Sequence, residues 1–210
     1  MKNQIILTLT TITLFLSSAA KAQDNTAFEK GTIVATAGYG FPDLYRNSLR
    51  VAYNGYSSRS VKGIGPLILK GDYGIVKFKW GHSVGAGIVL GYSSTKATYS
   101  YINYNTTNNT YTTSVDKYST ITIGARGSYH FFSKEKLDCY ASIGIGFNIN
   151  SYTEATSGYN AYITSGTTRS AIYETLTVGI RYYFTKNIGV YSEVGWDMSA
   201  PIQAGVALKF

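Results

Sequence analysis

The chain has 210 residues, of which 44% are hydrophobic, and it carries 22 glycines, 20 tyrosines and a formal net charge of +8. Its lysines and arginines are scattered through short polar segments and do not gather on one element, so we expect no nucleic-acid partner. The single cysteine, Cys139, excludes an internal disulfide and makes a small disulfide-stapled secreted module unexpected.

The first 22 residues have the three parts of a secretory signal peptide. Lys2 is basic, residues 5–16 form an apolar run, and Ala20-Lys21-Ala22 is a small-residue exit. We therefore predict cleavage before Gln23, export through the Sec pathway, and a mature chain of 210 − 22 = 188 residues. No later segment has the roughly 18 consecutive apolar residues that indicate a membrane helix.

After a short N-terminal segment, 23–30, the main signal is strict alternation of apolar residues with polar residues or glycine. This pattern predicts β-strands with one apolar face. It is shown, in chain order, by eight segments: 33–39, 67–75, 84–92, 119–131, 139–149, 172–184, 188–198 and 202–210. We therefore predict one β-domain over residues 31–210.

The connectors between these segments alternate in length. Links after the second, fourth and sixth segments are short and charged, whereas those after the first, third and fifth are long and polar: 41–65, 94–117 and 152–170. The last link, 199–200, is a short exception. Short turns on one side and long loops on the other are typical of outer-membrane barrels whose termini are periplasmic. The sequence therefore predicts an all-β, eight-stranded, antiparallel, up-and-down transmembrane β-barrel.

Aromatic residues lie near both ends of the expected strands, where rings favour the membrane interface. The periplasmic set is Tyr73, Trp80, Tyr129, Phe131, Tyr182, Phe184 and Phe210. The outer set is Tyr39, Phe41, Tyr92, Tyr173 and Trp196. Two belts separated by about nine residues match the length that a tilted strand needs to cross a bilayer, and a soluble sandwich gives no reason for them.

Through its strand rhythm and its terminal run, 202–210, the whole mature chain resembles the small outer-membrane β-barrel family of the OmpA/OmpX type, also described as porin-like. The resemblance implies an integral protein of a Gram-negative cell outer membrane, in contact with outer-membrane lipid, and we expect a monomer. It also implies that the barrel-assembly machinery is a partner during biogenesis. The implied assembly signal is Ile202, Ala204, Val206, Leu208 and Phe210. Because the chain ends at Phe210, we expect no peptidoglycan-binding domain of the kind found in larger members.

In such a barrel the polar strand faces turn inward. Their charged residues are Lys70, Asp72, Arg126, Arg181, Glu193 and Asp197, with Lys209 as a further candidate. Eight strands enclose little more than their own side chains, so these charges must neutralise one another. We expect a plug in which Arg126 and Arg181 bond to Glu193 and Asp72. The alternative, a charged permeation path, needs a wider lumen.

The sequence offers no active site. Gly85 and Gly87 lie within a strand and precede no helix, unlike the glycines of a phosphate-binding loop. Ser128 and His130 share one strand face, as a hydrolase requires, but no third orienting group is evident. No His, Cys or carboxylate cluster has the spacing of metal ligands, so we expect no metal and no cofactor.

The long links are the remaining place for function. Residues 99–113 are polar yet rich in tyrosine, which suits a binding surface, although a mobile loop or an extension of the strands fits equally well. We expect a non-enzymatic outer-membrane scaffold with surface-exposed loops that acts in envelope integrity or in adhesion and recognition. Two alternatives stay open: a narrow porin-like channel for small solutes, and a lipid-modifying enzyme.

Overall fold

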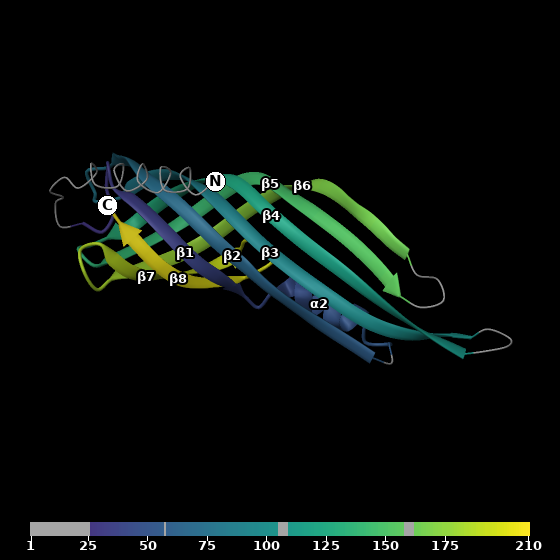
Figure 1. Ribbon diagram of the computed structural model, residues 1–210. Helices are drawn as coiled ribbons and strands as arrows, with labels where there is room; N and C mark the ends of the chain where they lie inside the picture. The colour runs from purple at the N-terminus through teal and green to yellow at the C-terminus, as the bar shows by residue number, and fades with distance from the viewer. Residues whose placement is uncertain (1–25, 57, 105–108, 158–161) are drawn as a thin grey trace, which may run out of the picture.

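The computed structural model describes residues 26–56, 58–104, 109–157 and 162–210. The signal peptide and its cleavage site, Ala20 to Gln23, lie outside the described residues. Within them, eight antiparallel strands follow one another around a closed barrel, as predicted (Figure 1). The first strand pairs with the last, so the sheet is continuous around the ring. None of the helices in these ranges is long and apolar enough to cross a membrane.

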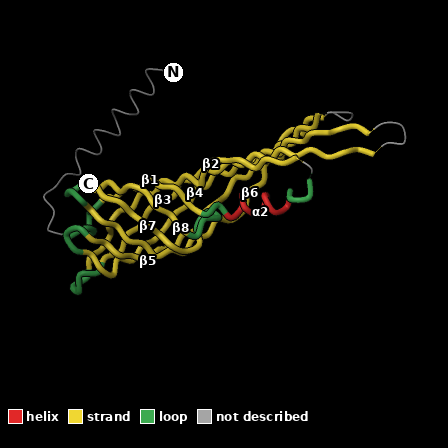
Figure 2. The backbone as a smooth tube through the Cα atoms, turned by 90° about the horizontal axis from the view of Figure 1, so that it is seen from below, coloured by secondary structure: helices red, strands yellow, loops and turns green. Residues whose placement is uncertain are grey.

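The strands fall into two length classes. Three have 8 or 9 residues: β1 (Ile33–Phe41), β7 (Ile188–Trp196) and β8 (Ile202–Lys209). Five have 20 to 25 residues: β2 (Ser58–Lys77), β3 (Ser83–Tyr104), β4 (Asn109–Ser133), β5 (Leu137–Ser157) and β6 (Tyr162–Tyr183). A tilted strand crosses a bilayer in about 9–11 residues. The long strands therefore continue past the membrane as a curved wall, which is visible beyond the barrel in Figure 2.

This wall occupies most of the long links that we expected to be loops. The described parts of 99–113 belong to β3 and β4, so this segment extends the strands, which is one of the three interpretations given above. The segment is rich in Tyr and Thr, which favour strands. Alternation does not reveal it because both faces of the wall carry polar side chains.

A short helix, α2 (Leu44–Ala52), lies in the first long link and was not predicted. Asp43 caps its N-terminus, accepting a hydrogen bond from the backbone N–H of Arg46 at 3.0 Å. The Arg46 guanidinium donates to the carbonyl of Gly65 at 2.8 Å. In Figure 1 the helix lies beside the extended part of β2. The side chain of Arg46 thus ties the helix to the backbone of β2 at Gly65.

The alternation places apolar side chains outside and polar side chains inside, as the sequence predicted. Ile143, Leu176 and Trp196 each expose more than 60% of their surface, whereas Ser142 and Thr177 expose 4% or less. An apolar exterior around a polar interior is the arrangement that a bilayer stabilises. One residue of the predicted outer aromatic belt is wrong: Tyr173 points inward and is only 2% exposed. Tyr173 belongs to the polar face of β6, and its hydroxyl donates a hydrogen bond to Asp197.

The C-terminal strand closes the barrel between β1 and β7. On its outer face Val206 and Leu208 are 51% and 41% exposed. They alternate with Gln203 and Ala207, which are buried. Ile202, Ala204, Val206 and Leu208 of the predicted assembly signal therefore lie on the outer face of β8, and Phe210 follows the strand. Recognition of this signal by the assembly machinery stays a prediction.

Candidate functional site

Lys70 on β2 is the centre of one half of the lumen. Its ammonium group donates to Glu193, to Asp197 at 2.7 Å, and to the side-chain oxygen of Gln203 at 2.8 Å. The Lys70 side chain is 1% exposed. Asp197 also accepts a 2.5 Å hydrogen bond from the hydroxyl of Tyr173. Three strands, β2, β7 and β8, are thus linked across the lumen by one buried cation.

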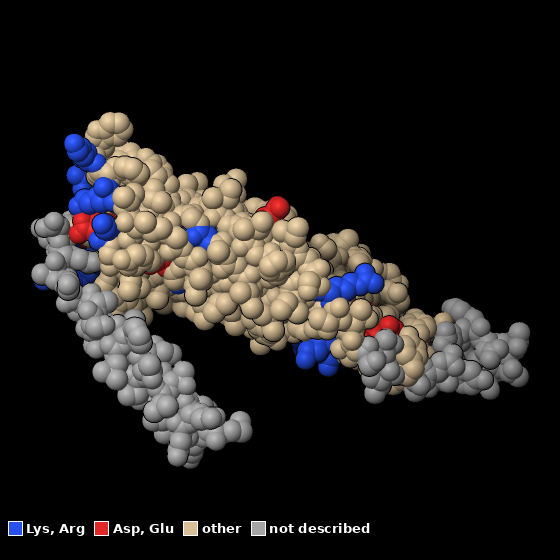
Figure 3. All heavy atoms as spheres, turned by 90° about the horizontal axis from the view of Figure 1, so that it is seen from above, with Lys and Arg blue, Asp and Glu red and all other residues tan. Residues whose placement is uncertain are grey.

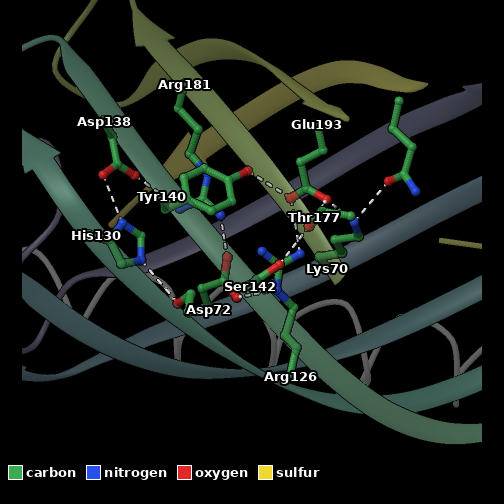
Figure 4. Close-up of polar contacts among 12 residues, drawn as sticks. Lys70, Asp72, Arg126, His130, Asp138, Tyr140, Ser142, Thr177, Arg181 and Glu193 are labelled. Atoms are coloured by element: carbon green, nitrogen blue, oxygen red, sulfur yellow. Dashed lines mark hydrogen bonds and ion pairs between the residues drawn. The ribbon is translucent and has the colours of Figure 1, made fainter. Parts of the chain in front are cut away.

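Asp72 lies between the two arginines in the other half. Arg126 contacts Asp72 through Nε at 3.2 Å and Glu193 through Nη1 at 3.1 Å. Arg181 pairs with Asp72 and, at 3.3 Å, with Asp138. These side chains are 0 or 1% exposed and point toward one another in Figure 4. Two arginines therefore fill space in the lumen that a solute would need.

The structure brings together all six charged residues that we assigned to the lumen network, and it adds Asp138. Lys209 lies apart from them: its ammonium group is 3.4 Å from the carbonyl of Thr26 and 4.8 Å from the centre of the Tyr183 ring. Each of the other seven charges contacts an opposite charge, which offsets the large cost of desolvation. The network, as we use the term below, is Lys70, Asp72, Arg126, Asp138, Arg181, Glu193 and Asp197.

Residues 26–30, which we call the N-terminal strap, close the end of the barrel that carries the short turns. The backbone N–H of Ala27 donates to the carbonyl of Lys134 at 3.0 Å, and that of Phe28 donates to Ser133 Oγ at 2.8 Å. The Phe28 ring is 1% exposed and stacks on His130, with centroids 3.7 Å apart. The position of this segment in the lumen was not predicted, because residues 26–30 show no alternation.

Ser128, His130 and Asp138 form a connected chain of hydrogen bonds. His130 Nε2 lies 3.0 Å from Ser128 Oγ, and His130 Nδ1 lies 2.8 Å from an oxygen of Asp138. The third group, which was not evident from the sequence, is Asp138, and the β4–β5 hairpin folds it back beside His130. The order of contacts is that of a Ser-His-Asp triad. All three residues are 3% exposed or less, and Phe28 covers the His130 ring, so Ser128 is closed off from substrates.

Beyond the network, toward the long strands, lies a half-open cavity of about 740 Å³. Tyr173 lies at its inner end, and its walls carry inward-facing side chains of β4 and β5. Thr120 and Thr122 donate to the side-chain oxygens of Asn150 and Asn148, at 2.8 and 2.6 Å, which orients both amides. We call this cavity the outer cup; its polar lining includes Tyr118, Thr120, Thr122, Asn148, Asn150, Tyr152, Arg169 and Tyr173.

Tyrosines join α2 to the inner face of the wall above the cup. The hydroxyl of Tyr53 donates to Asp116 at 2.5 Å, and its ring stacks on Tyr99 at 4.7 Å. Tyr45 meets Tyr118 edge to face at 5.6 Å. Burial raises the pKa of Tyr45 to about 12, with further contributions from Tyr118 and Asp43. Burial, with Asp116 nearby, also raises the pKa of Tyr99 to about 12. These phenols are therefore neutral hydrogen-bonding groups at physiological pH.

No family model and no curated protein matches the chain. Among solved structures it is similar to the N-terminal β-barrel domain of Pseudomonas aeruginosa OprF, at 14% identity over 85% of this chain and 96% of that one, with a TM-score of 0.36. It is also similar to Ail, the attachment invasion locus protein of Yersinia pestis, in complex with the heparin analogue sucrose octasulfate, at 13% identity over 87% and 100%, with a TM-score of 0.41. A third is the KdgM porin, at 13% identity over 85% and 98%, with a TM-score of 0.22. All three are small outer-membrane β-barrel proteins, the class that the sequence resembles. The fold of this chain rests on its own closed strand pairing.

Proposed function

We propose that the protein is a non-enzymatic outer-membrane barrel that closes its own lumen and presents the outer cup for recognition. The observation that carries this proposal is the position of the cup directly beyond a lumen filled by paired charges. A porin needs a continuous water path, whereas Lys70, Arg126 and Arg181 and their partners occupy the cross-section of an already narrow barrel. A closed barrel with an outward cavity is suited to holding a ligand at the surface.

The lining of the cup, in which the one cation, Arg169, is balanced by the one carboxylate, Glu174, favours a neutral ligand rich in hydroxyl groups, such as a saccharide. Amides and hydroxyls supply both donors and acceptors, and tyrosine rings add rigid apolar area. Thr120 and Thr122 hold the amides of Asn150 and Asn148 in one orientation, so less ordering remains to be done when a ligand binds. Ligand pockets of this size commonly combine apolar area with a few fixed polar groups.

Closure of the lumen is tested by single-channel recording in planar bilayers, with a porin as the positive control. We expect no steady currents from the inserted protein. Steady open-channel currents would defeat the closed-lumen proposal and favour the porin-like alternative. The variant F28A should also stay silent, because the network lies between the strap and the cup.

Recognition is tested with an array of neutral oligosaccharides probed by the detergent-purified protein. We expect N148A/N150A to lose the binding that the parent shows, because both substitutions remove oriented amides from the cup. The matched control, T168A/S170A, changes exposed side chains on the outer face of β6 and should bind like the parent. Binding that survives N148A/N150A would contradict recognition through the cup.

Roles in envelope integrity and in lipid modification have separate readouts. A deletion strain that is sensitive to detergent, and that N148A/N150A rescues as well as the parent, would favour integrity over recognition. The enzyme alternative predicts that a fluorophosphonate probe labels Ser128. We expect no labelling, because the serine is 3% exposed beneath the strap.

A further inference from the structure

Three lysines stand side by side on the extended wall. The strand register places Lys62 of β2 opposite Lys96 of β3, and Lys96 opposite Lys117 of β4. Directly opposite residues on neighbouring antiparallel strands have Cα atoms about 5 Å apart. The three ammonium groups therefore share a strip about 10 Å wide at its base. All three lysines are exposed. We call them the lysine row.

Alternation along the strands shows that the row is on the outer face of the wall. On β3, Tyr92 is 41% exposed on the lipid side, whereas Thr95 is 3% exposed and faces inward, so Lys96 faces outward. On β4, Asp116 is 3% exposed and bonded to Tyr53 inside the wall. Lys117, its neighbour, is therefore on the opposite face. The carboxylate nearest in sequence thus lies on the wrong side of the sheet to neutralise the row.

Like charges directly opposite one another destabilise a sheet. The ion pairs of the described residues join the network, the strap and the start of α2, and none of them includes a lysine of the row. In Figure 3, Lys and Arg atoms gather toward the two ends of the molecule, and the middle of this face is almost entirely uncharged. The row therefore combines high positive charge density with proximity to the apolar surface.

The height of the row corresponds to the lipid headgroups. Lys96 is 12 residues from Val84 on β3, and Lys117 is 12 residues from Tyr129 on β4. A rise of ~3.4 Å per residue and a tilt of about 45° give roughly 29 Å along the membrane normal. The apolar band of such barrels is about 25 Å tall, so the lysines stand just beyond its outer edge. One step closer to the membrane, the register aligns three hydroxyl residues: Ser94, Ser119 and Ser151.

We propose that the lysine row, with the serine row beneath it, binds the phosphate groups of an anionic lipid in the leaflet that surrounds the outer end of the barrel. Ammonium groups supply the charge that phosphate requires, and hydroxyls supply additional donors. The lipid phosphates relieve the repulsion among the lysines, while acyl chains cover the apolar face below. This inference rests on the membrane placement in the proposed function and is independent of what the cup binds.

The test uses the folded chain in detergent micelles, titrated with phosphatidic acid, phosphatidylcholine or inorganic phosphate, and counts bound lipid by native mass spectrometry. The parent should bind phosphatidic acid more tightly than phosphatidylcholine. Each lysine near an anionic surface contributes about fivefold in affinity, so K62Q/K96Q/K117Q should weaken phosphatidic acid binding on the order of 100-fold. K62R/K96R/K117R keeps the charge and should retain binding.

The matched control, K79Q/K136Q/K186Q, removes the same charge from three separate turns at the other end of the barrel, and should weaken binding by less than about fivefold. Equal binding of phosphatidic acid by the parent and by K62Q/K96Q/K117Q would overturn the proposal. So would complete displacement of the lipid by millimolar inorganic phosphate, which would make the row a site for free anions. A heat-dependent shift in gel mobility shows that each variant is folded. A parent protein that stays folded and soluble without detergent would instead refute the membrane placement.

Discussion

Replacing Lys70 with methionine removes the cation that links three strands across the lumen. Glu193 keeps Arg126 as a partner at 3.1 Å after this change. Asp197 keeps only its hydrogen bond from Tyr173 among the contacts described above, and its side chain is 0% exposed. Breaking a buried ion pair from one side costs about 3–5 kcal/mol, because the remaining charge stays dry and unpaired. We therefore expect K70M to lower the free energy of unfolding by that amount.

The reasoning is tested by urea unfolding of the reconstituted barrel, followed by tryptophan fluorescence, with gel mobility as an independent measure of folding. The exposed turn variant K134M should change stability by no more than about 0.5 kcal/mol. The double variant K70M/D197N removes the orphaned charge as well, so it should be less destabilised than K70M alone. A loss below about 1 kcal/mol for K70M, or no recovery in the double variant, would show that the lumen is hydrated rather than filled by paired charges.

Three further outcomes follow from the lipid face, the strap and the tyrosines. Val178→Arg places a charge on the lipid face and should cost about 2–4 kcal/mol in reconstituted unfolding; a variant as stable as the parent contradicts that facing. F28A removes the ring stacked on His130 and should cost about 3–5 kcal/mol, and a negligible loss would mean that the strap is not bound. Because the pKa values of Tyr45 and Tyr99 are raised from 10 to about 12, the folded state holds these protons more tightly. The resulting stabilisation is complete below pH 10 and is lost as the pH rises from 10 to 12. In a pH titration followed by absorbance at 295 nm, the parent should contain phenols that ionise only above pH 10, and Y45F/Y99F should lack that part of the signal.

The part of the fold inside the membrane was predictable because its strands separate two different environments. Lipid on one side and a polar lumen on the other impose a period of two, and Ile143, Leu176 and Val206 follow it. The wall and α2 lack this contrast. Both faces of the wall are polar, and α2 is a nine-residue helix with no fully buried side chain. Neither leaves a periodic apolar signal, so the sequence showed only long polar links.

The site was predictable to the extent that its residues lie on those same strands. A charged side chain such as Arg126 on the polar face of a membrane strand must point into the lumen. The residues of the network could therefore be predicted from the sequence. Asp138 was missed because it was assigned to a turn, although it pairs with Ser133 at the start of β5. Phe28 was missed because its position depends on contacts with residues more than a hundred positions away.

The unequal strand lengths connect the two proposed binding surfaces. Because β2 to β6 are neighbours and β7, β8 and β1 are short, the extension is a one-sided wall rather than a taller ring. Its inner face lines the cup and its outer face carries the lysine row, so a single sheet presents Asn148 to one ligand and Lys96 to another. The three lysines and the two asparagines have no partner in common, and substitutions without shared partners add within about 0.5 kcal/mol. K62Q/K96Q/K117Q combined with N148A/N150A should therefore lose lipid and saccharide binding to the same extents as the separate variants. A combined variant that departs from additivity would show that lipid on the outer face and the cup are coupled through the wall.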